Sequence, residues 1–337
     1  MEKIEKYNND LVKKDMENLY IIFKDLQKEK NNSILMLGWF QYFILISIEV
    51  LNYTKVNKTL KYKKVIENCR ARIKPFEMEY DEMYQKMEEL NLKKMNEYTE
   101  YVKKGFRTML SKFITNYGLY KINNNIIGNT FLYESLYKKI IYENGEINKN
   151  KMIAVSKEIG EIISDLMNFL KLERTYQGKS KDICIENEDY NVFENNNKLL
   201  KENIDINDGL ILLNSISIIN FYKYVICKMN VRKELKYRLG YIVYDSTYRN
   251  ILKVIGKIND REIIEKIQKY ECLNYRKYRN CMFHYDLVQD LKQGEIRDEM
   301  YLGIIHKYLN ISEEEYIKLI EEYMYEISDI LEKNILK

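Results

Sequence analysis

Proline and glycine are scarce in this chain, and their scarcity limits the folds open to it. There is one proline and there are twelve glycines among 337 residues. Closely spaced β-hairpins depend on turns rich in these residues, so a fold built mainly from hairpins is disfavoured. Apolar residues instead recur at spacings of three and four over long segments, which is typical of amphipathic helices. We therefore expect an all-α protein.

Helical patterns cover most of the sequence. The expected helices span residues 3–30, 34–52, 56–115, 131–143, 150–174, 208–229, 232–256, 260–273, 276–291, 298–309 and 313–334. Pro75 is well placed to open a helix, and the apolar positions after it predict a long helix or a coiled-coil arm over 76–115. The sequence YGLYKINNNIIGNT at 117–130 is expected to form a loop.

One apolar segment, ILMLGWFQYFILISIEVL at 34–51, is nearly long enough to span a membrane. It contains Gln41, Ser47 and Glu49, and only isolated basic residues flank it. A carboxylate near the end of a short span is costly in lipid, so we expect a helix buried in the protein core and no membrane partner. The N-terminal sequence is charged and lacks the apolar stretch of a signal peptide, which favours a cytoplasmic protein.

The length and a change in composition predict two domains. A chain of 337 residues exceeds the usual size of one domain. Residues 178–207 are rich in acidic, amide and lysine residues and have no sustained period, as expected for a polar linker or inserted loop. We therefore expect a helical regulatory or dimerisation domain at 1–177 and a compact helical domain at 208–337.

Net charge and cysteine spacing restrict the kinds of site. The net charge is +4, which is mildly basic, so a nucleic-acid site would have to be local. The five cysteines are scattered, without a CxxC pair or a histidine at the spacing of a zinc finger. We expect free thiols, no metal site and no cofactor.

One of the two histidines lies in the sequence YRNCMFHYDL at 278–287. On a helix, residues four apart share a face, so Arg276, Asn280 and His284 would line one side, with Arg279 beside them. Histidine exchanges a proton near neutral pH, and arginine holds a phosphate through two hydrogen bonds. Histidine could therefore take a proton from a ribose 2′-hydroxyl while arginine stabilises the charged phosphate, a cleavage that needs no metal.

Basic and aromatic residues near this motif suit an RNA partner, because cations grip phosphates and rings stack on unpaired bases. The residues expected to bind RNA are Arg249, Arg276, Lys277 and Tyr285, and Lys236 and Arg238 are further cations suited to gripping phosphates. The other histidine, His306, has no arginine at a suitable spacing and is expected to pack or to lie on the surface.

The motif R-N-x-x-x-H, formed by Arg279, Asn280 and His284 in a helical setting, resembles the signature of HEPN-domain ribonucleases. The resemblance covers about residues 208–337 and implies a HEPN-like helical bundle. It implies that Arg279, Asn280 and His284 are catalytic, that the active site is shared between two paired domains, and that the products carry 2′,3′-cyclic phosphate and 5′-hydroxyl ends. It also implies a role as a toxin, in antiphage defence, or beside an antitoxin or CRISPR-associated partner.

Three functions follow as alternatives. The first is a homodimeric endoribonuclease with a composite site. The second is an inactive HEPN-like module that docks RNA or a partner protein. The third is a structural helical protein whose arm at 76–115 mediates assembly and in which the motif is coincidental.

Overall fold

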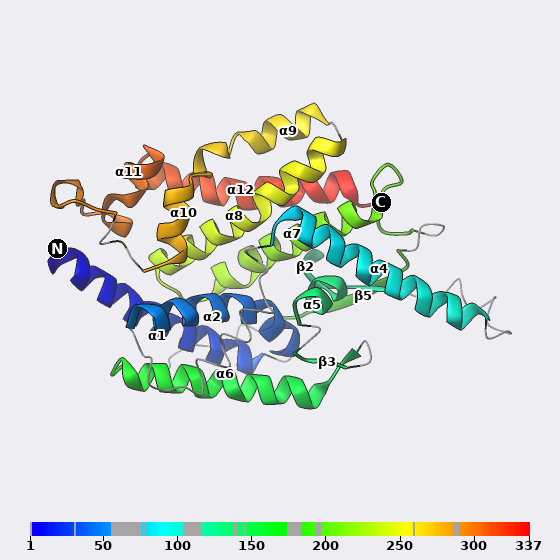
Figure 1. Ribbon diagram of the computed structural model, residues 1–337, viewed down its shortest axis with the longest axis horizontal. Helices are drawn as coiled ribbons and strands as arrows, with labels where there is room; N and C mark the ends of the chain where they lie inside the picture. Colours follow the sequence, from blue (N-terminus) through cyan, green and yellow to red (C-terminus); the bar gives the residue numbers. More distant parts are fainter. Residues whose placement is uncertain are drawn as a thin grey trace.

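The computed structural model describes residues 2–29, 32–54, 76, 78–103, 116–137, 140–143, 146–173, 183–192, 197–258, 260–285, 287 and 290–337. These residues are predominantly helical, with a small sheet, which confirms the expected fold class (Figure 1). Helical order follows from the three- and four-residue apolar spacing, because that spacing gives each helix one face to bury.

Among the described residues, the N-terminal half contributes five helices, of which α1 packs most extensively against the apolar helix α2. They are α1 (Glu2–Lys28), α2 (Asn32–Thr54), α4 (Tyr80–Lys103), α5 (Thr130–Tyr137) and α6 (Lys149–Phe169). Helix α1 packs between α2 and α6, which forms one long edge of the molecule (Figure 1). Helix α2 is buried over most of its length, as expected from its continuous apolar sequence.

Two segments have the length and composition that would let them cross a membrane, Ser33–Thr54 and Ile206–Lys228. In each, 89% of the most apolar window is buried inside the protein. Burial of this extent is also what a core helix of this composition shows.

The C-terminal half contains the long helices that form the centre of the molecule. They are α7 (Ile206–Tyr224), α8 (Lys233–Ile258), α9 (Arg261–Gln268), α10 (Arg276–Phe283), α11 (Ile304–Leu309) and α12 (Glu313–Ile335). Helices α7, α8 and α12 contact one another, and α10 packs on α8 and α11. Helix α12 begins at the N-cap Ser312, whose hydroxyl accepts a hydrogen bond from the Glu315 amide at 3.1 Å.

The expected loop at 117–130 is instead a β-hairpin. Strands β1 (Tyr117–Ile122) and β2 (Asn125–Asn129) are antiparallel. The turn between them uses Asn123 and Asn124, both with positive φ (49° and 66°), as a two-residue hairpin turn requires. Asparagine tolerates this conformation, so the hairpin forms without glycine. The scarcity of glycine was therefore not evidence against a hairpin at this position.

The segment at 178–207, expected to be a polar linker or inserted loop, contains a strand. Strand β5 (Glu186–Tyr190) lies within it and pairs antiparallel with β1, giving the strand order β2-β1-β5. A separate two-stranded sheet pairs β3 (Tyr142–Glu143) with β4 (Glu146–Ile147). Strand β5 carries the sequence ENEDY, and such a polar strand has no apolar alternation to reveal it.

Buried side chains from both expected domains belong to one continuous core. The cluster runs from Ile4 in α1 to Ile335 in α12 and includes α2, the sheet and α7. The first half of α4 joins this core through Met83, Met87 and Leu90, and α4 contacts α7 and α8. This part of the expected arm is therefore packed, while residues 104–115 lie outside the described residues.

Candidate functional site

The motif that contains Arg279 and His284 spans a helix end. Helix α10 runs from Arg276 to Phe283, shorter than the expected 276–291. His284 follows as an extended residue (φ −118°, ψ 161°), although its amide still donates to the Asn280 carbonyl at 2.9 Å. His284 therefore does not share a helical face with Arg276 and Asn280. The direction of its side chain is set by the contacts that its imidazole makes.

A buried carboxylate holds the imidazole of His284. Its Nδ1 lies 2.8 Å from Oε2 of Glu49, near the end of α2. The Glu49 side chain is 5% exposed, whereas that of His284 is 51% exposed. A carboxylate only accepts hydrogen bonds, so the proton of a neutral imidazole resides on Nδ1 and Nε2 keeps its lone pair. An exposed ring with this tautomer is equipped to accept a proton from a substrate.

A second buried carboxylate holds Arg279. Asp245 of α8 is 3% exposed, and its Oδ2 accepts from Nε of Arg279 at 2.9 Å and from Nη2 of Arg249 at 3.2 Å. The guanidinium of Arg279 also lies 4.5 Å from the ring centroid of Phe283. Asp245 thus fixes the guanidinium of Arg279 through Nε, and because the side chain is 29% exposed, an anion can reach it from solvent.

The remaining predicted RNA contacts divide into two groups. Arg276 and Lys277 are exposed on α10, as a surface that meets RNA requires, and Asn280, which was predicted to be catalytic, is exposed on the same helix. Tyr285 is not: it is 2% exposed, and its ring faces the guanidinium of Arg238 at 4.1 Å. Tyr285 therefore cannot stack on a base in this structure, and its expected role in RNA binding is corrected to a structural one. Burial also raises the pKa of its phenol well above the ordinary value.

A fully buried ion pair fixes the end of α10. Arg238 of α8 donates to the carbonyls of Met282 at 2.6 Å and Phe283 at 3.3 Å, and its Nη1 lies 2.8 Å from Oδ2 of Asp15 in α1. The same Asp15 oxygen accepts from the Tyr285 hydroxyl at 2.7 Å. A cation at this position satisfies the last carbonyls of the helix and complements its dipole. The residues on both sides of His284 are thus held in place.

The cysteine inside the motif is not a nucleophile. Cys281 is 4% exposed, and its thiol lies 3.2 Å from Oδ2 of Asp290. Burial, together with this carboxylate, raises the pKa of the Cys281 thiol well above its ordinary value. The sulfur therefore stays protonated and unreactive at neutral pH.

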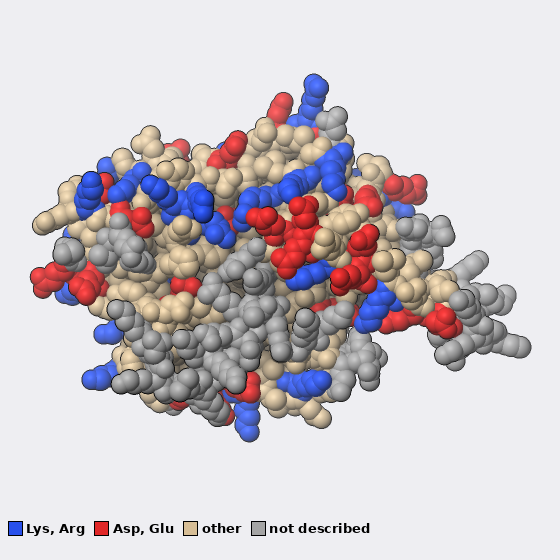
Figure 2. Space-filling model, in the orientation of Figure 1, with Lys and Arg blue, Asp and Glu red and all other residues tan. Residues whose placement is uncertain are grey.

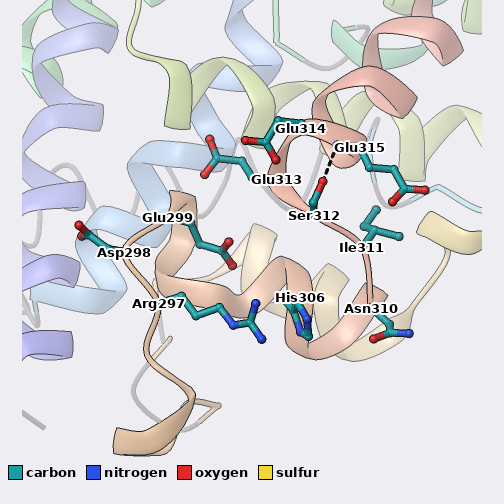
Figure 3. A pocket seen from close by; sticks show the side chains of 10 residues that line it. All are labelled: Arg297, Asp298, Glu299, His306, Asn310, Ile311, Ser312, Glu313, Glu314 and Glu315. Carbon is teal, nitrogen blue, oxygen red and sulfur yellow. Dashed lines mark hydrogen bonds between the residues drawn. The ribbon is translucent and has the colours of Figure 1, made fainter.

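The other histidine, His306, lines a surface pocket at the start of α12. The pocket is lined by Arg297, Asp298, Glu299, His306, Asn310, Ile311, Ser312, Glu313, Glu314 and Glu315. Figure 3 shows the guanidinium of Arg297 beside the imidazole of His306. Five carboxylic side chains outnumber this one arginine, so the pocket repels a phosphate more than it attracts one. We therefore place the candidate site at His284.

Among the residues that the structure describes, no group of three or more His, Cys, Asp or Glu side chains is arranged to hold a metal ion. Comparisons with protein-family models, with curated proteins and with solved structures find no match for this chain.

Sequence reasoning missed the residues that hold the site. Glu49 and Asp245 were not assigned to it, although Glu49 was visible as a carboxylate inside an apolar segment. Such a residue needs a buried partner, and a buried carboxylate of this kind is the sequence signal that could have pointed to the site. Arg238, expected to grip phosphates, is instead 2% exposed and holds the end of α10, which corrects that expectation.

Proposed function

We propose that the protein is a metal-independent RNA endonuclease. The observation that supports this best is the contact between the buried carboxylate of Glu49 and Nδ1 of the exposed His284. With the Nδ1 proton held by Glu49, Nε2 keeps its lone pair on a ring that is 51% exposed, which is the arrangement by which carboxylate–histidine pairs serve as general bases. The resemblance of the motif to HEPN ribonucleases points to the same chemistry.

The proposed reaction is an internal transfer. Nε2 of His284 takes the proton of a ribose 2′-hydroxyl, and the 2′-oxygen bonds to the adjacent phosphorus. The bond from phosphorus to the 5′-oxygen breaks, and that oxygen takes a proton, which gives 2′,3′-cyclic phosphate and 5′-hydroxyl ends. Arg279, fixed through Nε by Asp245, neutralises the charge that gathers on the phosphate oxygens.

A second copy of the chain is proposed to complete the site. Cleavage requires an acid for the leaving oxygen as well as a base, and the motif occurs once in the sequence. The exposed residues Arg276, Lys277 and Asn280 form a surface on which a second α10 could pair. The same proposal places the protein in the cytoplasm as a toxin or antiphage effector, with an antitoxin or a CRISPR-associated protein as partner.

The test is incubation of the purified protein with total cellular RNA in EDTA, alongside His284→Ala and Arg279→Ala, with analysis of the fragment ends. We expect the parent alone to cut and to leave cyclic phosphates. RNA left intact by the parent, including under conditions where it is dimeric, would contradict the proposal. RNA that is bound but not cut by all three proteins would instead indicate the inactive binding module.

A further inference from the structure

Two cations on α8 continue the candidate site along the surface. Arg249 and Lys253 are four residues apart, so they share a face and lie about 6 Å apart along the helix axis. Their side chains are 42% and 54% exposed. The spacing along the axis is comparable with that of neighbouring phosphates on a nucleic-acid strand.

This pair is physically joined to the nuclease motif. Arg249 and Arg279 share the buried carboxylate of Asp245, so one anchor sets the position of both guanidinium groups. Figure 2 shows a band of Lys and Arg over the region of α10 and α8, with a group of Asp and Glu beside it where α4 begins. The band is therefore a path that leads from the motif along α8.

Two acidic side chains lie opposite the two cations, Glu79 just before the start of α4 and Asp81 in its first turn. Glu79 is 4.0 Å from Arg249, and Asp81 is 3.4 Å from Lys253. These carboxylates are 77% and 78% exposed, and both contacts are long. Exposed ion pairs of this kind contribute little to stability, so an incoming phosphate can replace them at small cost.

The residue between the two acids is fixed, in contrast to its neighbours. Tyr80 is 6% exposed, and its hydroxyl donates to Oδ1 of Asp208 at 2.5 Å and contacts Nζ of Lys257. Tyr80 thus holds the start of α4 against α7 and α8. The side chains of Glu79 and Asp81 can therefore rotate away from α8 while the backbone at Tyr80 stays in place.

We propose that Arg249 and Lys253 bind two neighbouring phosphates of the RNA strand whose scissile bond lies at His284. The strand takes the place of the carboxylates of Glu79 and Asp81, which act as built-in competitors for the same cations. This inference rests on the proposed function for the identity of the polymer as RNA. To that function it adds the path that the RNA strand follows along α8. It also assigns Glu79 and Asp81 the role of weakening the binding of any RNA.

The test measures binding of a fluorescent single-stranded RNA of random sequence at several salt concentrations, with His284→Ala as the parent so that no cleavage occurs. Arg249→Gln/Lys253→Gln should make the slope of log affinity against log salt shallower by about 1.4, or about 0.7 for each phosphate contact. At 0.1 M salt this corresponds to about 25-fold weaker binding. Glu79→Gln/Asp81→Asn should tighten binding about threefold to tenfold, because two exposed ion pairs no longer compete.

The matched control is Lys266→Gln/Lys318→Gln, which removes the same charge from exposed positions on α9 and α12. It should bind within about twofold of the parent, and far-ultraviolet circular dichroism should show every variant folded. Equal loss in the control and the α8 variant, an unchanged slope, or no RNA binding by the parent would each overturn the inference. Failure of cleavage by the natural sequence with these binding results intact would overturn the proposed function alone.

Discussion

The two central side chains of the motif are held in the same way but from different parts of the chain. Asp245, which holds Arg279, is 34 residues away and lies within the C-terminal half. Glu49, which holds His284, is 235 residues away in the apolar helix α2. The cation can thus be positioned by the C-terminal helices alone, whereas His284, the proposed proton acceptor, depends on the N-terminal half. The N-terminal helices therefore contribute a residue to the candidate site, in addition to the regulatory or dimerisation role expected of them.

The largest expected effect on RNA cleavage comes from removing the carboxylate of Glu49, the more distant of the two in sequence. Glu49→Gln should lower RNA cleavage by about 10³- to 10⁴-fold, because the amide no longer fixes the tautomer of His284 that leaves Nε2 basic. RNA binding should stay within about twofold of the parent. The measurement is the single-turnover cleavage rate, with the exposed Glu262→Gln as control; an unchanged rate in Glu49→Gln would contradict the assigned role.

The buried pair between α1 and α8 should matter most for stability. Arg238→Met should lower the free energy of unfolding by about 3–5 kcal/mol, because Asp15 is left buried without its cation. Adding Asp15→Leu should recover part of this loss, since no unpaired charge then remains. Urea denaturation followed by circular dichroism measures both variants. If the double variant is less stable than Arg238→Met, the charge of Asp15 is not the cause.

Loss of the shorter-range anchor should have a smaller effect on chemistry. Asp245→Asn keeps the shape of the side chain but loses the charge that orients Arg279 and Arg249. We expect cleavage to fall by about 10- to 100-fold, as for a misplaced positioning group. A loss greater than that of Glu49→Gln, in parallel rate measurements, would reverse the order of importance given to the two anchors.

The corrected role of Tyr285 leads to a milder prediction. Tyr285→Phe removes one hydrogen bond to Asp15 and should cost about 1–2 kcal/mol of unfolding free energy. RNA affinity should stay within about twofold, because the ring is buried. Affinity that falls tenfold while the protein remains folded would restore Tyr285 to the RNA-binding surface.

The smallest effect on stability is expected at the sheet, far from the candidate site, when the pH is lowered. The hydrogen bond from Lys121 lowers the pKa of Glu188 below its ordinary value. Stability from this pair is therefore present above the unfolded pKa of about 4.3 and is lost as the pH falls through the lower folded pKa. Because Glu188 is 42% exposed, the loss should be under about 1 kcal/mol. Denaturation between pH 5 and pH 3 should show this loss in the parent and not in Glu188→Gln.

The sequence predicted most of the helices because their apolar spacing is strong and local. It did not predict the hairpin at Asn123 and Asn124, since these residues replace the glycine that usually marks such a turn. It also placed the end of α10 too late, because the extended backbone at His284 reflects contacts with other elements.

For the site, the sequence identified Arg279, Asn280 and His284 but not their supports. A local motif can be read within six residues, whereas the pairing of Glu49 with His284 arises only when α2 packs against the end of α10. Burial of Tyr285 has the same origin, since it depends on Asp15 in α1. A carboxylate in an apolar segment signals that Glu49 needs a buried partner, but the identity of that partner is set by long-range packing and cannot be read from the local sequence.

The most direct test of this account is a double-mutant cycle on the RNA cleavage rate with Glu49→Gln, His284→Ala and both together. If Glu49 acts through His284, the double variant should cleave no more slowly than His284→Ala alone, because groups that act as a unit are strongly non-additive. Losses that multiply in the double variant, or a Glu49→Gln protein that cleaves like the parent, would contradict the claim that the N-terminal half holds the catalytic base.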